Sequence, residues 1–218
     1  MIRAQYKDES YFKAFIDSQE KRIDKFEKTI RIINPDEVDK VRQCKSYICS
    51  FYWDLVSAKY SMGFSKEEIA NDVLALFSYF TSVNSYNEMI NYLSFAILFD
   101  ISGSNLDAII DNEEYDDPLV GKLKAYFCEK QGAHSDALLY PNYSKPFFDF
   151  LNNVIDLKTF IKYIDEEWYD SCKDLYFYDS HKNSNQTYTG YWCWLAAAIL
   201  KMKSEKAVFS SFIPTDLI

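Results

Sequence analysis

Apolar residues recur at three- and four-residue steps along the first part of the chain. The repeat occupies positions 12, 16, 19, 23, 26, 30 and 33, where only Gln19 is polar, and charged residues fill the opposite face. Because an α-helix has 3.6 residues per turn, this spacing places the repeat on one side of a helix. The pattern predicts one long amphipathic helix from about Asp8 to Asn34.

Residues that start and stop helices recur along the rest of the chain. Asn34-Pro35 predicts that Asn34 caps a second helix, which should end at Gly63. Two capping boxes are expected to open the next helices, Ser65 with Glu68 and Ser85 with Glu88. Further helix starts are expected at Asn105, at Asp117 with Pro118, at Pro146, at Asp156 and at Tyr191.

Glycine and proline are too scarce for a protein made of β-strands. The chain has five of each, whereas an all-β fold needs a turn about every 8–12 residues. We therefore predict an all-α fold of about nine helices in two packed helical subdomains, without significant sheet. The break at Ile101–Ser104 suggests an N-terminal domain over 1–103 and a C-terminal domain over 104–218.

The charge balance disfavours nucleic acid as a partner. The chain has 24 Lys and Arg against 33 Asp and Glu, which gives a net charge of −9. The window from Glu67 to Gly121 contains carboxylates but no Lys or Arg. Since phosphates are held by basic side chains, the sequence predicts no nucleic-acid binding.

Several features indicate a cytoplasmic protein that does not contact a membrane. The N-terminus lacks the apolar core of a signal peptide. The longest apolar run, 191–200, is much shorter than the about 20 residues that a membrane span needs. The five cysteines are odd in number and irregularly spaced, which is typical of reduced thiols.

The densest acidic segment follows the predicted domain break. Three interpretations are open: a solvated loop in which Asp117 caps a helix, a protein-binding surface, and a site for a divalent cation. The segment lacks the alternating ligands and central Gly of an EF-hand loop, so we predict no metal site. We take its carboxylates as the candidate partner-binding residues: Asp111, Glu113, Glu114, Asp116 and Asp117.

No catalytic constellation is recognisable. Asp179-Ser-His181 places a carboxylate near a base, but no Ser or Cys nucleophile lies on a recognisable turn. Cys193 lies between two tryptophans in an apolar helical pattern, where a buried neutral thiol is expected. We therefore predict no catalytic residues, no cofactor and no enzymatic activity.

The C-terminal part contains a distinctive series of aromatic and polar residues. It comprises Trp168-Tyr169, Tyr178–Asn185, Thr187-Tyr188, Gly190–Trp194, Ala196–Ala198 and the tail Pro214–Leu217. This series resembles the C-terminal domain of PoNi-type immunity proteins. The helical first half, ending at Leu93–Leu98, is similar to the N-terminal domain of that family. The chain departs from the family at Leu195, where an acidic residue would be expected.

The resemblance implies a function and a partner. PoNi proteins are encoded beside PoNe toxins, which are DNases that bacterial secretion systems deliver into neighbouring cells. The immunity protein binds the toxin domain in the cytoplasm and blocks it, a role in bacterial competition through polymorphic toxins. The residues alone leave two alternatives: a metal-dependent hydrolase that uses the carboxylates of 111–117, and a helical interaction scaffold without a toxin partner.

The motif residues that carry the resemblance are expected to have structural roles. His181, Lys182 and Asn183 would tie the polar connection 179–188 to helix ends, and Tyr191 and Trp192 would begin and anchor the last helix. The full set is Trp168, Tyr169, Asp179, His181, Lys182, Asn183, Tyr188, Gly190, Tyr191 and Trp192.

Overall fold

The computed structural model describes residues 2–115, 117–128, 135–206 and 208–218. In these ranges all regular structure is helical, which confirms the predicted all-α class. The chain divides into two compact units, each described here by itself. Unit 1 comprises Met1–Ser82 with Asp179–Gly190, and unit 2 comprises Val83–Tyr178 with Tyr191–Ile218.

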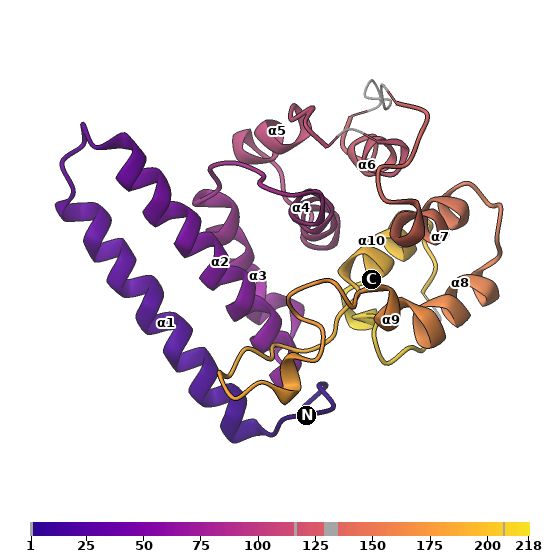
Figure 1. Ribbon diagram of the computed structural model, residues 1–218, viewed down its shortest axis with the longest axis horizontal. Coiled ribbons are helices and arrows are strands. Elements are labelled where there is room, and N and C mark those ends of the chain that lie inside the picture. The colour runs from indigo at the N-terminus through magenta and orange to yellow at the C-terminus, as the bar shows by residue number, and fades with distance from the viewer. Residues whose placement is uncertain (1, 116, 129–134, 207) are drawn as a thin grey trace. The chain divides into compact units, whose positions relative to one another are not determined.

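Unit 1 is built on α1 (Glu9–Ile32), α2 (Val38–Met62) and α3 (Lys66–Ser78). α1 and α2 form a helical hairpin, and α3 packs against α2 (Figure 1). The predicted amphipathic helix is confirmed as α1, because four positions of its repeat, Phe12, Ile16, Gln19 and Ile23, are buried together with Phe15.

Local signals set most helix ends in unit 1. The carboxylate of Asp8 accepts the Tyr11 N–H at 2.9 Å and caps α1. Gly63, with φ of 106°, ends α2 in the left-handed region, where a side chain would be strained. The capping box of Ser65 and Glu68 is confirmed, with both reciprocal hydrogen bonds present.

Two predicted caps are wrong in detail. Asn34 does not cap α2, because its Oδ1 accepts the Asp36 N–H within a turn and the helix begins only at Val38. Ser85 does cap its helix, but the Glu88 carboxylate accepts the N–H of Asn84, so the reciprocal bond of a capping box is not made to Ser85.

α2 also carries a half-buried carboxylate, Asp54. Burial raises the pKa of Asp54 to about 6, against the opposing effect of the nearby Arg22 guanidinium. This acid should therefore make the stability of unit 1 depend on pH.

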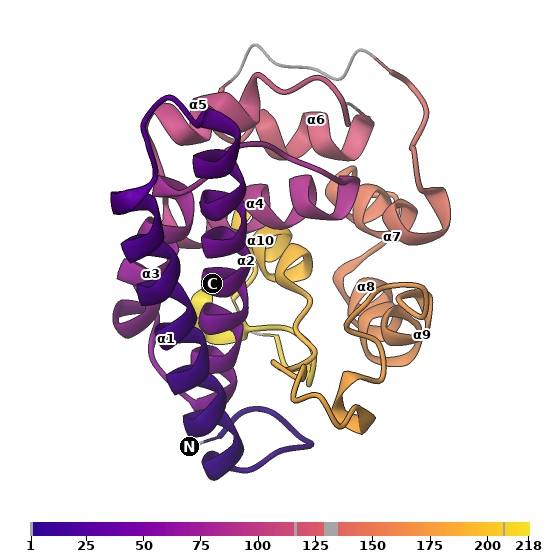
Figure 2. The ribbon, with the colours of Figure 1, turned by 60° about the vertical axis from the view of Figure 1, so that its left-hand side comes forward.

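Unit 2 contains α4 (Tyr86–Phe99), α5 (Ser104–Ile110), α6 (Pro118–Lys124), α7 (Pro141–Leu151), α8 (Leu157–Tyr163), a π-helical turn (Ile164–Trp168), α9 (Tyr169–Ser171) and α10 (Trp194–Met202). α4 and α10 lie side by side at its centre (Figures 1 and 2). The segment Trp194–Leu200 of α10 is buried throughout, as expected for a helix that is apolar on all sides. At its end, Lys201 donates to the carbonyl of Ile97 at 2.7 Å and pairs with Asp100, which joins it to the C-terminal end of α4.

The predicted caps at Asp117 and Asp156 are confirmed, but two other boundaries in unit 2 differ. α7 begins at Pro141 and contains Pro146, which had been expected to open it. α10 begins at Trp194, three residues after the predicted start at Tyr191.

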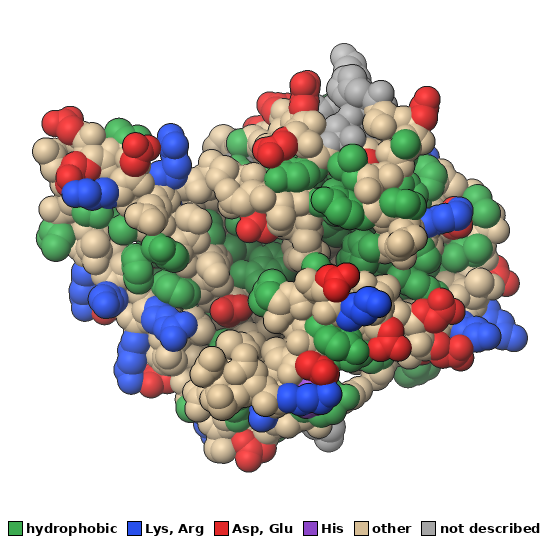
Figure 3. Space-filling model, viewed as in Figure 1, with side chains coloured by type: hydrophobic (Ala, Val, Ile, Leu, Met, Phe, Trp, Pro, Cys, Tyr) green, Lys and Arg blue, Asp and Glu red, His purple; other side chains and the backbone are tan. Residues whose placement is uncertain are grey.

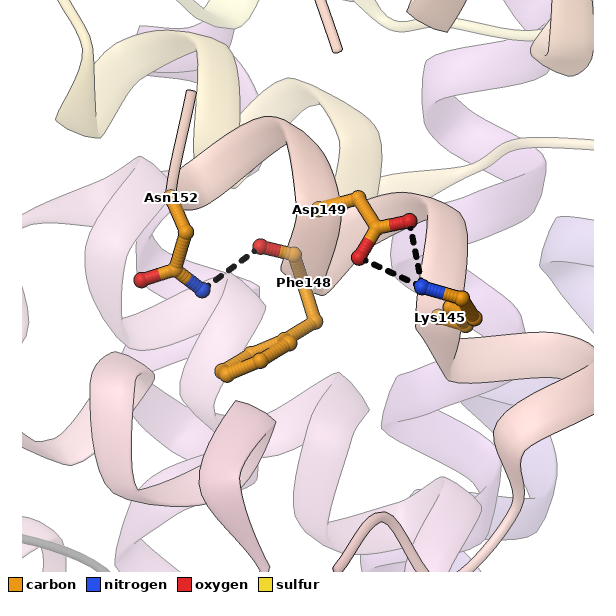
Figure 4. Close-up of polar contacts among 4 residues, drawn as sticks. All are labelled: Lys145, Phe148, Asp149 and Asn152. Atoms are coloured by element: carbon orange, nitrogen blue, oxygen red, sulfur yellow. Dashed lines mark hydrogen bonds and ion pairs between the residues drawn. The ribbon is translucent and has the colours of Figure 1, made fainter. Parts of the chain in front are cut away.

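α7 contains an internal proline, and two side-chain contacts lie near it in the same helix. Pro146 has no N–H and so removes one helical hydrogen bond. Figure 4 shows Lys145 donating to both oxygens of Asp149, at 2.8 and 2.7 Å, one turn along the helix. Asn152 then donates to the Phe148 carbonyl at 2.8 Å and closes the C-terminal end of α7.

The compact units do not coincide with the halves of the sequence. α4, which was expected in the N-terminal domain, lies in unit 2, and the segment 179–190 returns to unit 1. The domain boundary between 103 and 104 stays a prediction about the sequence.

Candidate protein-binding site

The acidic segment after α5 lies at the surface of unit 2. The side chains of Asp111, Glu113 and Glu114 are exposed, and the Glu114 N–H donates to the Asn112 side chain at 3.1 Å. Figure 3 shows carboxylates gathered over α5 on one face of unit 2. Asp116, a further candidate, lies outside the described residues. Asp111, Glu113 and Glu114, which lie close together in the sequence, are therefore all accessible to a partner protein.

Asp117 has a different environment from the rest of the segment. Its side chain is 0% exposed. One oxygen accepts the Val120 N–H at 2.9 Å, and the other accepts the Tyr86 hydroxyl at 2.9 Å and the Leu139 N–H at 3.1 Å. Because its carboxylate is enclosed and bound by three donors, Asp117 does not face a partner, which corrects the expected binding role. It joins α4, α6 and the segment before α7.

Leu139, whose N–H donates to Asp117, and the adjacent Tyr140 expose apolar side chains at the surface. Leu139 is 47% exposed and Tyr140 is 53% exposed, although the Tyr140 ring packs 4.8 Å from that of buried Tyr86. Partial desolvation and then the Glu114 carboxylate raise the pKa of Tyr115, with smaller contributions from two other neighbours, Glu88 and Tyr140. We call this group the Tyr140 patch: Glu88, Glu114, Tyr115, Leu139 and Tyr140.

Sequence reasoning missed the Tyr140 patch. Its signal was the apolar run at 138–140 directly before Pro141. Figure 3 shows hydrophobic side chains between α5 and α7, on the same face as the carboxylates over α5. An apolar centre beside acidic side chains is a common composition for a protein interface.

Part of the connection between α9 and α10, Asp179–Gly190, belongs to unit 1 and packs beside the N-terminal segment of that unit. The His181 ring stacks on Tyr6 at 4.1 Å between centroids. Burial lowers the pKa of His181, and the neighbouring Lys182 adds to this effect while Asp179 opposes it. Lys182 also pairs with Asp179 at 2.8 Å, and the Asn183 side chain accepts a backbone N–H within the same loop.

Tyr188 fixes the end of this connection. Its ring is buried, its N–H donates to the Tyr11 hydroxyl at 3.0 Å, and that hydroxyl donates to the Tyr188 carbonyl at 3.0 Å. Ser61 donates to the next carbonyl, that of Thr189. Gly190 follows with φ of 106°, a conformation that favours glycine. These contacts join the loop to α1 and α2, and a structural role for the loop residues of the motif stays a prediction.

The remaining motif residues form an aromatic cluster in unit 2. Trp168 is buried and lies 5.4 Å from the ring of Phe212, and Tyr169 lies 4.7 Å from Tyr191. Tyr191 and the half-buried Trp192 precede α10 outside regular structure and do not begin the helix, which corrects that expectation. Leu195 is buried in α10, so the position at which the family would have an acid is here part of the core.

Two further features bear on the kind of site. Within the described ranges, no three His, Cys, Asp or Glu side chains are grouped so that they could hold a metal ion. Among the helices that the structure describes, none combines the length and the apolar character that crossing a membrane requires.

The fold and the exposed patch define an all-α protein of two helical units. The family model described as PoNe immunity protein (PoNi), N-terminal, matches residues 3–111, and that described as PoNe immunity proteins (PoNi), C-terminal, matches residues 115–209. The chain therefore belongs to the PoNe immunity protein family, which implies a toxin protein as its partner. No curated protein and no solved structure matches the chain.

Proposed function

We propose that this protein is a cytoplasmic inhibitor that binds a cognate secreted DNase of the PoNe type in a one-to-one complex, without a cofactor and without catalysing a reaction. The observation that carries the proposal is the match of the N- and C-terminal PoNi domains across nearly the whole chain.

The charge of the chain supports a DNase as the partner. A nuclease must hold phosphates with Lys and Arg, so its DNA-binding surface is basic. The chain has a net charge of −9. Exposed Asp111, Glu113 and Glu114 would attract such a surface, and complementary charges mainly accelerate association. In this proposal the acidic segment guides the toxin, and the motif residues of the C-terminal part maintain the fold.

Co-expression with the adjacent toxin gene tests the proposal. Bacterial cells that express the PoNe toxin domain should survive only when this protein is also present, and a tagged toxin should retain it through purification. A catalytically inactive toxin domain provides the control for toxicity and should still bind. Cells that die with equal frequency in the presence and absence of the protein would contradict the proposal.

A further inference from the structure

We propose that the Tyr140 patch is the centre of the toxin-binding surface, and that it receives an Arg or Lys side chain of the toxin together with an adjacent apolar residue. This inference rests on the proposed function and adds to it the surface and the chemistry of contact.

The patch is held in place before any partner arrives. The Leu139 N–H is bound to buried Asp117 at 3.1 Å, and the Tyr140 ring packs on Tyr86. The Tyr140 carbonyl also accepts the Ser144 N–H at 2.8 Å and the Ser144 hydroxyl at 2.7 Å at the start of α7. Since these contacts fix the backbone of the patch and the Tyr140 ring in the free protein, binding loses less conformational entropy.

The side chains of the patch suit the centre of a protein interface. Tyrosine is enriched among the residues that dominate binding energy, because it combines a large apolar ring with a polar end. Leu139 and Tyr140 are both about half exposed, so each has apolar area that a partner can still bury. Tyr115 adds a second, partly exposed tyrosine, and Tyr140 contributes to its electrostatic environment.

The charges of the patch select a basic partner. The carboxylates of Glu114 and Glu88 act on Tyr115. The part of unit 2 from Val83 to Gly121 contains no Lys or Arg, and the ammonium group of the following Lys124 donates to the Asn112 carbonyl. A cation beside a tyrosine ring and a carboxylate gains both a cation–π contact and a charge-assisted hydrogen bond. A second copy of the same acidic patch would instead bring like charges together, so the patch favours the toxin over self-association.

The test measures the affinity of folded variants for the purified PoNe toxin domain. Leu139→Ser with Tyr140→Ala removes the apolar centre but leaves the backbone contact to Asp117. Tyr176→Ala is the matched control, because Tyr176 is 75% exposed in the same unit and outside the patch. We expect the double variant to lose at least about 30-fold in affinity and the control to change by less than about threefold. Leu139→Ser alone replaces the double variant if the latter unfolds, and about tenfold weaker binding is then expected.

The outcomes separate this inference from the function on which it rests. A folded double variant that binds within threefold of wild type overturns the inference and leaves the inhibitor function standing. A wild-type protein that does not bind the toxin overturns both. If the free wild-type protein sediments as a dimer and the double variant as a monomer, the patch is occupied by a second copy and the inference is also wrong.

Discussion

Replacing Asp117 with alanine should destabilise unit 2 severely. The buried carboxylate accepts hydrogen bonds from Val120, Tyr86 and Leu139. Loss of the N-cap of α6 costs about 1 kcal/mol. The Tyr86 hydroxyl and the Leu139 N–H then lose their acceptor, at about 1–3 kcal/mol for each buried group. Because Leu139 is partly exposed, its N–H belongs at the low end of that range.

The sum is a loss of about 3–5 kcal/mol in the free energy of unfolding. This is a large share of the about 5–15 kcal/mol that a native protein has in total. For a chain of this length, the melting temperature should fall by about 6–20 °C. Tyr86→Phe removes only one of the three donors, so its effect should be smaller, at about 1–2 kcal/mol.

Urea unfolding followed by tryptophan fluorescence measures mainly the relevant unit, since Trp168, Trp192 and Trp194 lie in unit 2 and only Trp53 of the four tryptophans lies in unit 1. Glu113→Ala is the matched control, because it removes an exposed carboxylate from the same segment and should change stability by less than about 0.5 kcal/mol. If Asp117→Ala is as stable as Glu113→Ala, the buried network does not hold unit 2 together and the reasoning is refuted.

Three further predictions concern the loop, the pH dependence and the acidic segment. His181→Ala should lower the free energy of unfolding by about 1 kcal/mol through loss of ring stacking, while toxin binding persists. Since burial lowers the pKa of His181 in the folded protein, the wild type should lose stability as pH falls through about 6.5, and the variant should not. The pKa of Asp54 in the folded protein is raised to about 6, so the stabilisation from its protonated form is full below about pH 4 and is lost as pH rises through 6. In urea titrations, Asp54→Asn should therefore be more stable than wild type by about 1–3 kcal/mol at pH 7.5, but not at pH 4. The triple variant Asp111→Asn, Glu113→Gln, Glu114→Gln should bind toxin with a slower association rate and a flatter salt dependence in surface plasmon resonance, and an unaltered salt slope would remove these carboxylates from the interface.

Sequence patterns predicted the helices well where the signal was local. The repeat in α1 and the caps at Ser65, Asp117 and Asp156 depend on residues within one or two turns. Prediction of α7 was wrong for the same reason, since both Pro141 and Pro146 can occupy the first turn of a helix. Only the packing of the following residues decides which proline begins it.

The candidate site could be predicted only in part, because burial depends on residues that are distant in sequence. Exposure of Glu113 and Glu114 follows from their place between two helices. Asp117, only a few residues later, is enclosed by Tyr86 and Leu139, which lie 31 and 22 positions away. The Tyr140 patch depends on the same contacts, so no local pattern could have identified it.

Inhibition of the PoNe toxin domain in a DNA cleavage assay tests the central claim most directly. With toxin concentration well above the dissociation constant, a one-to-one inhibitor should reduce cleavage linearly and abolish it at one equivalent of protein per toxin. Inactivation by a small fraction of an equivalent would indicate that the protein acts on the toxin as an enzyme. Cleavage that continues at several equivalents would show that the protein is not its inhibitor.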